Sequence, residues 1–432
     1  MKLPSRNENV LHDQEGKFMT EHMPLLIVNV GLDFGGSLIT VGRLAAKNRR
    51  VYFEYDAGFL KRGLALSPFR LPLKSGVQEF DPGLFDGLPG VFNDSLPDGW
   101  GRLLLDRALR VRGILPGAFT PLDRLAHVGR HGMGALVYQP DYSGMPSQRT
   151  VDLDELSQES RHILEGESSD VLEMLLALNG SSAGARPKAM IGVNAGRTNI
   201  IQGVDELPEG FEHWLVKFPN MADGIDSGAV EFIYNQMARE AGLDVMECHL
   251  FSAKKGPGYF ATKRFDRLPG NRRLHKHTAS GLLHADFRVP SLDYQDLVRG
   301  TMALTRDMRE AQKMFRLAVF NVLSHNRDDH AKNFSFLMDE HGKWSMAPAY
   351  DLMYSAGPGG EQSTLVMGEG KDPGTAQLLE LAAKADLPIE EAKIIIDQTR
   401  HALNRWKILA HEIGVSSEMI DLIHSVMART YR

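Results

Sequence analysis

The chain of 432 residues has one cysteine, Cys248. A single cysteine excludes an intrachain disulfide and any zinc site built mainly from cysteines. Long apolar runs are also missing, because the longest, about Met23 to Leu32, is too short to span a bilayer. Residues 1–20 are polar and mixed in charge, without the apolar core of a signal peptide. We therefore expect no membrane association and a cytoplasmic location.

An excess of positive charge is absent too. The chain has 49 Lys and Arg against 55 Asp and Glu, for a net charge of −6. A nucleic-acid binder that is basic overall is not indicated. A local basic patch is still compatible with these totals, and the six arginines between residues 102 and 130 are the candidate for a partner or DNA contact. A solvated helix face explains them better.

The composition changes from segment to segment along the chain. These changes, like the length of the chain, predict several domains. Residues 1–23 read as a flexible tail and residues 24–140 as a small α/β subdomain. A linker rich in Gly, Pro and Ser is expected at 141–148. Residues 141–270 are rich in strand patterns, and residues 271–432 are mainly helical. A strand-rich lobe followed by a helical lobe is the order of a bilobal protein kinase, so we predict an α+β, kinase-like fold.

Hydrophobic periodicity marks the expected elements. Strands are expected at 25–30, 188–193, 214–218 and 259–265, and helices at 102–110, 153–178, 230–242, 302–308, 311–324, 375–385, 389–413 and 417–430.

The most informative segment is the polar loop that follows the helix expected at 311–324. Asp328 stands five residues before Asn333, and Asp351 follows after two alternating segments that predict a hairpin, 334–337 and 343–346. Phosphoryl transfer needs a carboxylate near the attacking hydroxyl, and Mg²⁺ needs amide and carboxylate oxygens. The pattern therefore predicts Asp328 as the catalytic base and Asn333 and Asp351 as Mg²⁺ ligands. A surface loop whose polar residues only cap helices and turns is the competing interpretation.

Two further segments suit a nucleotide. Lys217 ends an otherwise apolar strand, where burial would require an anionic partner. Glu231, at the edge of the next helix's apolar face, is a candidate for a structural ion pair with it. The segment 180–188 is rich in small residues whose backbone N–H groups can approach phosphates, with Arg186 and Lys188 adding charge. It matches neither common glycine-rich phosphate motif, and a plain connector is an alternative.

Two other signals are weaker. Residues 409–416 look like the middle of a helix-turn-helix, which would make the chain a DNA-binding regulator. A helix that ends at Gly414 and a new helix that starts after Ser416 explain them better, because Glu418 and Asp421 stand where basic residues would be needed. The histidines at 275, 277, 284, 325 and 330 lack the spacing of a metal site.

Taken together, the segments resemble the motif series of the HipA family of serine/threonine kinases, which are toxins of type II toxin–antitoxin systems. The resemblance runs in order from about residue 30 to the end. An N-terminal subdomain signature of this family resembles residues 96–102. The other five motifs lie at 181–188, 213–219, 261–267, 326–335 and 347–352.

The resemblance implies ATP and Mg²⁺ as cofactors and gives roles to individual residues. Asp328 corresponds to the catalytic aspartate, and Asn333 and Asp351 correspond to the metal ligands. The implied nucleotide-binding residues are Ala183, Gly184, Ala185, Arg186, Lys188, Lys217, Lys263, Arg264, Phe265, His330, Lys332 and Tyr350. Ser181, with its neighbour Ser182, aligns with a serine whose autophosphorylation inactivates the kinase.

The family also implies partners. Its members phosphorylate cellular proteins, among them aminoacyl-tRNA synthetases, and pair with a small helix-turn-helix antitoxin of the HipB type, so that DNA contact is indirect. A catalytically weak corepressor and a small-molecule phosphotransferase stay as alternatives. This chain departs from the best-known members at Arg186-Pro187, where they have Gln-Glu, and at Asp329, where they have glycine. We expect Asp329 to add negative charge beside the metal.

Overall fold

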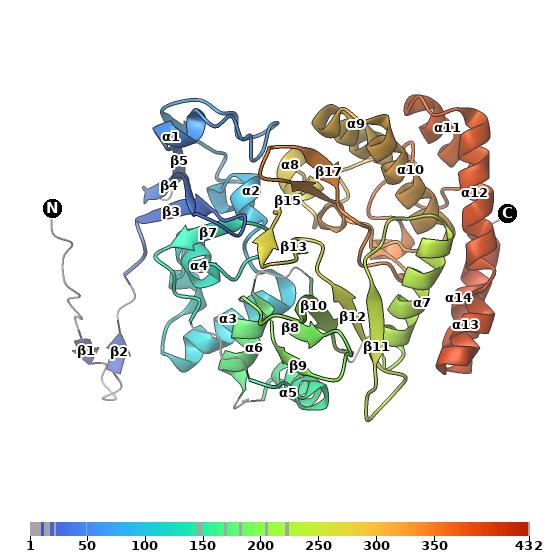
Figure 1. The fold of residues 1–432 in the computed structure, drawn as a ribbon, viewed down its shortest axis with the longest axis horizontal. Helices are drawn as coiled ribbons and strands as arrows, with labels where there is room; N and C mark the ends of the chain where they lie inside the picture. Colours follow the sequence, from blue (N-terminus) through green and yellow to red (C-terminus); the bar gives the residue numbers. More distant parts are fainter. Residues whose placement is uncertain are drawn as a thin grey trace.

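The structure is a computed structural model. It describes residues 10–12, 18–20, 23–48, 50–144, 149–167, 171–180, 184–203, 206–220 and 224–430. These residues form an N-terminal subdomain, a second sheet with three helices, and a helical lobe that contacts both (Figure 1). Within the predicted tail, a short ladder pairs β1 (Val10–His12) with β2 (Phe18–Thr20).

The N-terminal subdomain is built on a five-stranded antiparallel sheet of order β6-β5-β4-β3-β7. Its strands are β3 (Ile27–Leu32), β4 (Ile39–Lys47), β5 (Arg50–Tyr55), β6 (Val77–Glu79) and β7 (Leu136–Gln139). Its helices are α1 (Ala57–Leu60), α2 (Gly90–Asn93), α3 (Gly99–Val111) and α4 (Pro121–Val128). Val28, Val30 and Leu32 alternate along β3 and are buried, as expected for a strand with one face on a core.

The second sheet has the order β11-β12-β10-β8-β9, also antiparallel. Its strands are β8 (Lys188–Asn194), β9 (Ile200–Gln202), β10 (Phe211–Lys217), β11 (Cys248–Phe251) and β12 (Tyr259–Lys263), and its helices are α5 (Leu153–Glu165), α6 (Leu172–Asn179) and α7 (Ser227–Glu240). The single helix expected at 153–178 is wrong. The chain forms α5 and α6 instead, because Gly166 adopts a left-handed conformation (φ 94°) that ends α5.

The helical lobe contains α8 (Ala279–Leu283), α9 (Tyr294–Thr305), α10 (Met308–Leu323), α11 (Thr375–Lys384), α12 (Ile389–Leu403), α13 (Trp406–Ile413) and α14 (Ser417–Thr430). It also holds a three-stranded sheet, β15 (His275–Thr278), β16 (Ser335–Met338) and β17 (Trp344–Met346), and the small ladder of β13 (Arg267–Leu268) with β14 (Arg272–Arg273). The predicted hairpin is confirmed as β16 and β17, in which Phe336 pairs with Met346. No pattern in the sequence predicted β15.

Two helix predictions in this lobe are corrected. The stretch 389–413 forms α12 and α13, which meet at Asn404 and Arg405. The stretch 302–308 spans the end of α9 and the start of α10. There, Arg306 has a left-handed backbone (φ 55°), and the Asp307 carboxylate accepts the Arg309 N–H as the cap of α10.

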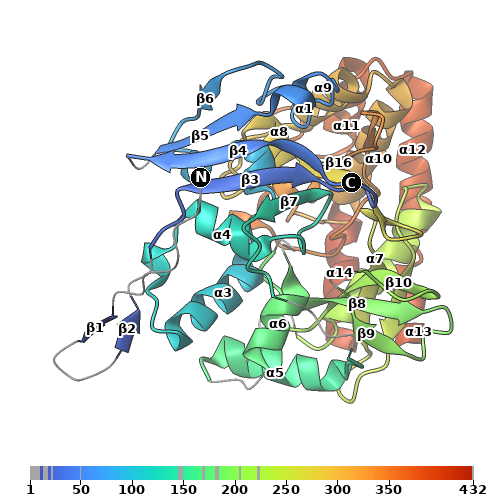
Figure 2. The ribbon, with the colours of Figure 1, turned by 60° about the vertical axis from the view of Figure 1, so that its left-hand side comes forward.

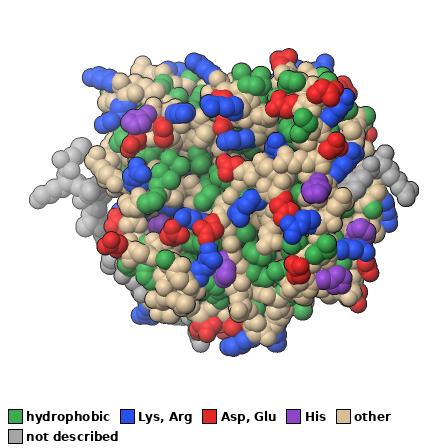
Figure 3. All heavy atoms as spheres, turned by 45° about the vertical axis from the view of Figure 1, so that its right-hand side comes forward, with side chains coloured by type: hydrophobic (Ala, Val, Ile, Leu, Met, Phe, Trp, Pro, Cys, Tyr) green, Lys and Arg blue, Asp and Glu red, His purple; other side chains and the backbone are tan. Residues whose placement is uncertain are grey.

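The helix-turn-helix interpretation of residues 409–416 is not supported by the packing. α13 ends at Gly414 (φ 87°) and α14 begins at Ser417, as the simpler interpretation predicts. Trp406 is buried, and its indole N–H donates to the Ile420 carbonyl at 3.0 Å. The two helices thus pack on each other, and α13 also packs on α7. On the face shown in Figure 3, acidic and basic side chains are interspersed.

The apolar cores cross the boundaries between these parts. One cluster extends from Val28 in β3 to Met427 in α14. A second joins Trp100 and Leu104 of α3 to α5, α6 and the second sheet. Figure 2 shows α3 beside α6, below the N-terminal sheet. Within the described part of the chain, we find no helix that is both long and apolar enough to cross a membrane.

Candidate active site

The loop after α10 holds the predicted catalytic residues in a fixed arrangement. α10 ends at Ser324, and His325 reverses the chain with a left-handed backbone (φ 56°). The buried Asn326 amide then donates to the Asn321 side-chain oxygen at 3.0 Å. Further along, the Asn333 side-chain amide donates to the Asp328 carbonyl at 2.7 Å. This bond closes the loop and fixes Asp328 and Asn333 relative to each other.

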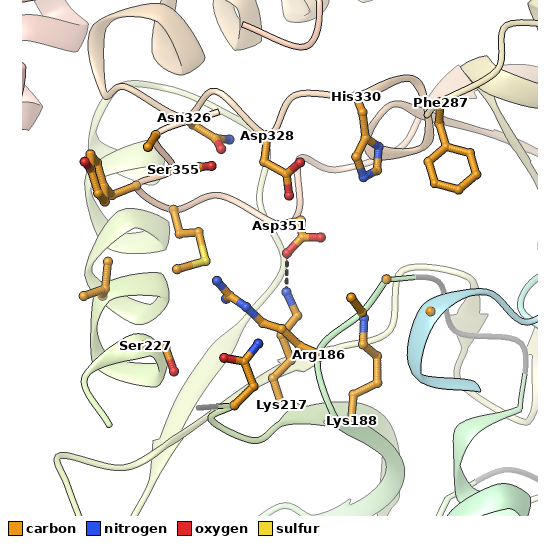
Figure 4. Close-up of a pocket in the computed structure, with 18 of the residues that line it drawn as sticks. Arg186, Lys188, Lys217, Ser227, Phe287, Asn326, Asp328, His330, Asp351 and Ser355 are labelled. Atoms are coloured by element: carbon orange, nitrogen blue, oxygen red, sulfur yellow. Dashed lines mark hydrogen bonds and ion pairs between the residues drawn. The ribbon is translucent and has the colours of Figure 1, made fainter. Parts of the chain in front are cut away.

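The β16–β17 hairpin returns the chain to the same place, where it delivers Asp351. The Lys217 ammonium lies 2.5 Å from an Asp351 carboxylate oxygen (Figure 4). It also lies 2.6 Å from a Glu231 oxygen. The predicted pair of Lys217 and Glu231 therefore exists, and Asp351 completes a triad. Asp351 adopts a left-handed backbone (φ 57°), which is unusual for a residue with a side chain and is often found at functional sites.

Two lysines face each other across the second sheet. Lys188 in β8 and Lys217 in β10 are directly opposite in the strand register. Like charges in that position repel each other, so anions must be near. Burial lowers the pKa of Lys217, but Asp351 and Glu231 more than compensate and raise it. Burial together with the charge of Lys217 lowers the pKa of Lys188 to about 8.

A cavity of about 710 Å³ lies between the second sheet and the predicted catalytic loop. Lys188, Lys217 and Asp351 line it. In Figure 4, Arg186, Lys188 and Lys217 rise from one side toward Asp328 and Asp351 on the other. Cations on one wall and carboxylates on the opposite wall suit a bound anion that also carries a metal ion.

Asp328 opens into this cavity and has the character of a proton acceptor. Partial desolvation raises its pKa, and the negative charge of Asp351 raises it further, while His330 opposes both effects. A carboxyl whose pKa moves toward neutrality is better suited to take a proton from a hydroxyl.

A narrower cavity of about 110 Å³ continues from the first one under the second sheet. Its lining is mainly apolar and includes Leu215, Phe260 and Tyr350. The Phe265 and Tyr350 ring centroids are 5.4 Å apart. The two rings contact each other and form one wall of an aromatic slot, which suits a flat heterocycle such as a purine base.

Three of the implied nucleotide-binding residues, Lys263, Arg264 and Phe265, meet in this cavity. Their side chains are used differently. The Lys263 ammonium pairs with Glu212 at 2.5 Å, and the Lys263 N–H donates to the Glu247 carbonyl. The Arg264 guanidinium is buried and binds Asp266 through two nitrogens, at 3.0 and 2.7 Å. Its side chain is thus committed to the protein core, and its backbone N–H donates to the His213 carbonyl at 2.9 Å.

The catalytic loop also reaches the narrow cavity. The Tyr350 hydroxyl donates to the Lys332 carbonyl at 2.5 Å, and it shares a hydrogen bond with the Ser335 hydroxyl at 2.6 Å. His330 lines both cavities, with its ring 5.5 Å from that of Phe287. The predicted nucleotide residues of this loop therefore lie together at the junction of the two cavities.

The phosphate loop is described only in part. Ser181, Ser182 and Ala183 lie outside the described residues. The predicted residues Gly184, Ala185, Arg186 and Lys188 line the large cavity. An Arg186 nitrogen lies 3.7 Å from Glu231, which extends the ion cluster around Lys217.

The expectation for Asp329 is wrong. Its side chain points into the protein, away from the predicted metal ligands, and is fully buried. The carboxylate accepts hydrogen bonds from the Tyr294 hydroxyl, the Gln362 amide and the backbone N–H groups of Ser363 and Thr364. Four donors solvate its charge and fasten the catalytic loop to the segment 362–364.

Some lining residues were not found from the sequence. Phe287, Asn326 and Ser355 line the large cavity, as does Asp98 from the N-terminal subdomain. Asp98 lies inside the segment 96–102, where a motif resemblance was already visible. Asn326 likewise opens the motif 326–335, whereas Phe287 and Ser355 carry no local signal.

A Mg²⁺ ion fits this site. Among the described residues, no cluster of three or more His, Cys, Asp or Glu side chains could hold a metal by itself. Mg²⁺ in phosphoryl-transfer sites is usually bound by one or two carboxylates together with the substrate's phosphates, so a complete protein cage is not required. The Asp351 carboxylate and the Asn333 amide oxygen provide oxygen donors of the required kind.

Models of protein families match two parts of the chain. The model described as HipA-like C-terminal domain matches residues 180–406. The model described as HipA N-terminal domain matches residues 37–139. Together they cover the N-terminal sheet except β3, the second sheet and most of the helical lobe.

Individual proteins are similar at lower identity. The protein named "Putative kinase Y4dM" from Sinorhizobium fredii is 25% identical over 252 residues, which are 51% of this chain and 58% of that protein. The "Serine/threonine-protein kinase toxin HipA" from Shewanella oneidensis is 28% identical over 202 residues, 40% of this chain and 45% of that one. The matched region thus spans about half the length of these two relatives.

A solved structure extends the likeness over nearly the whole chain. A chain of the Shewanella oneidensis complex of HipA, HipB and operator DNA is similar with a TM-score of 0.67 and 18% identity, covering 93% of this chain and 95% of that one. At this identity the likeness shows the fold. The predicted α+β fold, with an N-terminal subdomain before two lobes, is confirmed.

Proposed function

Because the chain belongs to the HipA family, we propose that it is a serine/threonine protein kinase that uses ATP and Mg²⁺ and acts as a HipA-like toxin. The observation that carries the proposal is the cavity in which Asp328 and Asp351 face Lys188 and Lys217. The N-terminal subdomain and the motif order argue against a small-molecule phosphotransferase. The cytoplasmic location stays a prediction from the sequence.

In the proposed reaction, the hydroxyl oxygen of the acceptor bonds to the γ-phosphorus of ATP as the bond from that phosphorus to the bridging oxygen breaks. Asp328 orients the hydroxyl and accepts its proton, and ADP leaves. Lys188, Lys217 and Arg186 attract the phosphates. The aromatic slot of Phe265 and Tyr350 receives the adenine. A Mg²⁺ ion held by Asn333 and Asp351 would neutralise phosphate charge.

Two acceptors of the phosphate are proposed. One is a cellular protein, and the resemblance makes an aminoacyl-tRNA synthetase the class to test. The other is the chain itself at Ser181 or Ser182, where a phosphate would add about −1.5 to −2 of charge beside the phosphate loop and repel ATP. A HipB-like antitoxin is the proposed partner, and contact with DNA would occur through it. The support for this partner is the likeness to a HipA, HipB and operator DNA complex.

Mass spectrometry of the purified protein after incubation with Mg²⁺ and ATP tests the proposal. We expect one added phosphate at Ser181 or Ser182 in the wild type, and a loss of about 10²–10⁴-fold in rate for Asp328→Asn. Asp397→Asn is the matched control, because that side chain is 75% exposed on α12. If wild-type protein that starts unphosphorylated neither binds nor consumes ATP, the kinase proposal is wrong and the corepressor alternative gains.

A further inference from the structure

Asp98 stands at the start of α3 but does not cap that helix. The Asp152 and Asp293 carboxylates, at the equivalent positions of α5 and α9, accept N–H groups of their own helices. Asp98 makes no such bond to α3. Because aspartate at this position normally stabilises a helix through that bond, the side chain of Asp98 serves other groups at the expense of its own helix.

Those groups are the phosphate loop and the catalytic loop. The Gly184 N–H donates to one Asp98 oxygen at 2.6 Å, and the Lys332 ammonium donates to the other at 2.5 Å. The two side chains are 15% and 6% exposed, so water does little to screen the charge pair. One carboxylate of the N-terminal subdomain thus ties together the two loops that enclose the predicted phosphate site.

The backbone around Asp98 holds the same glycine from the other side. The Trp100 N–H donates to the Gly184 carbonyl at 3.0 Å. Gly99 has a positive φ of 42°, and a Cβ at this position would lie 2.5 Å from the Gly184 carbonyl oxygen. Only glycine allows this approach. Both hydrogen-bonding groups of Gly184 are therefore engaged by residues 98–100.

Lys332 is held in place by a second group. Its ammonium lies 4.4 Å from the centroid of the Phe287 ring, a cation–π contact, in addition to the bond to Asp98. A buried lysine without a counter-ion would lose its charge or move toward water. Loss of Asp98 would therefore shift Lys332 at the junction of the two cavities and at the same time release Gly184.

We infer that Asp98 is a positioning residue for phosphoryl transfer, which holds the phosphate loop over the catalytic loop through Gly184 and Lys332. The inference rests on the proposed function. It makes the N-terminal subdomain a structural part of the active site, and it assigns to the segment 96–102 a role in nucleotide binding.

The test compares Asp98→Ala, Asp98→Asn and Asp98→Glu with the control Asp56→Asn. Asp56 caps α1, in the same subdomain but outside the site. Hydrogen exchange of peptides covering 184–188 and the affinity for a fluorescent ATP analogue are measured on the full chain. We expect Asp98→Ala to speed exchange at 184–188 and to weaken the analogue at least tenfold. Asp98→Asn, which keeps an acceptor for Gly184 but loses the charge for Lys332, should lie between it and the wild type.

A double-mutant cycle between Asp98→Asn and Lys332→Met separates positioning from general damage. We expect their effects on affinity to be less than additive, because both break the same bond. Equal exchange and affinity in wild type and Asp98→Ala, or equal losses in Asp56→Asn, would overturn the inference. If the wild type binds nucleotide but transfers no phosphate, the kinase proposal fails while these readouts still decide the role of Asp98. If the wild type binds no nucleotide, hydrogen exchange at 184–188 alone decides whether Asp98 positions the phosphate loop.

Discussion

At the scale of single residues, the wall of the large cavity brings several positive charges close together. Lys188 is 4% exposed and lies opposite Lys217, which already pairs with Asp351 and Glu231. The pKa of Lys188 is lowered to about 8 for this reason, from an ordinary value of 10.5. An arriving phosphate would add negative charge beside Lys188, so nucleotide binding and protonation of Lys188 should be linked.

This linkage predicts a pH dependence of ATP affinity. Below pH 8 Lys188 is protonated and attracts the phosphates. Above pH 8 the neutral amine must take up a proton when ATP binds, so affinity falls by up to about tenfold per pH unit. Titrations of ATP between pH 7 and 9.5 measure the effect, with Lys188→Arg as the control that stays charged. Equal pH profiles for the two proteins would contradict the assignment.

The same lowered pKa acts in the opposite direction on folding. Between pH 8 and 10.5 the unfolded chain binds more protons at Lys188 than the folded chain does. The free energy of unfolding therefore gains a term from this residue that increases with pH in that window. Binding and stability thus respond to alkaline pH with opposite signs, which distinguishes this lysine from an ordinary surface lysine.

At the scale of elements, Asp329 joins the catalytic loop to α9 and to the segment 362–364. Replacing it by alanine leaves the Tyr294 hydroxyl, the Gln362 amide and two backbone N–H groups without their acceptor. We expect Asp329→Ala to lower the free energy of unfolding by about 3 kcal/mol or more, because each unsatisfied buried donor costs roughly 1–3 kcal/mol.

Urea unfolding and hydrogen exchange at 362–364 measure this effect. Tyr294→Phe is the comparison variant, since it removes one donor and leaves the carboxylate with three. It also removes the acceptor of the buried Asn321 amide, so it should cost about 2 kcal/mol. Similar losses for the two variants would show that Asp329 is not the centre of the network.

The elements also show what the sequence could and could not predict. α14 was predicted at its observed bounds because its apolar period and its start after Ser416 are local signals. The break between α12 and α13 was missed because Asn404 keeps a helical backbone and no Gly or Pro marks the end. β15 was missed because its residues, among them His275 and His277, do not alternate in polarity.

The candidate site divides in the same way. Asp328 and Asn333 belong to one loop, and the predicted hairpin brings Asp351 beside them, so local spacing was enough. Asp98 and Lys332 are separated by 234 positions, and only the folded chain brings them together. The burial of Asp329 likewise depends on donors from distant elements, and its identity alone suggested the opposite orientation.

At the scale of the whole molecule, carboxylates join the N-terminal subdomain to the rest, and three of those in the described part of the chain lie near the cavities. Asp98 reaches the two loops described above. Asp94 accepts the Thr278 N–H and hydroxyl, each at 2.7 Å, and lies 2.7 Å from the His277 ring nitrogen. Asp266 lies outside the subdomain and accepts the N–H of Gly134, which lies inside it, at 2.6 Å. All three contacts lie at or next to the lining of the cavities.

This arrangement predicts that the chain unfolds as one unit. The apolar cluster from Val28 to Met427 joins the N-terminal subdomain to the helical lobe, and the second cluster joins α3 of that subdomain to the second sheet, so none can lose its packing alone. Scanning calorimetry should show one transition whose calorimetric and van't Hoff enthalpies agree.

Asp94→Asn should shift that whole transition to a lower temperature, at a cost of about 2 kcal/mol, because it weakens charge-assisted bonds in a buried place. The exposed Asp81→Asn, in the same subdomain, should leave the transition in place. Two resolved transitions, or a shift of only part of the heat in Asp94→Asn, would mean that the N-terminal subdomain is an independent module, and that its contacts with the phosphate loop form only after both parts have folded.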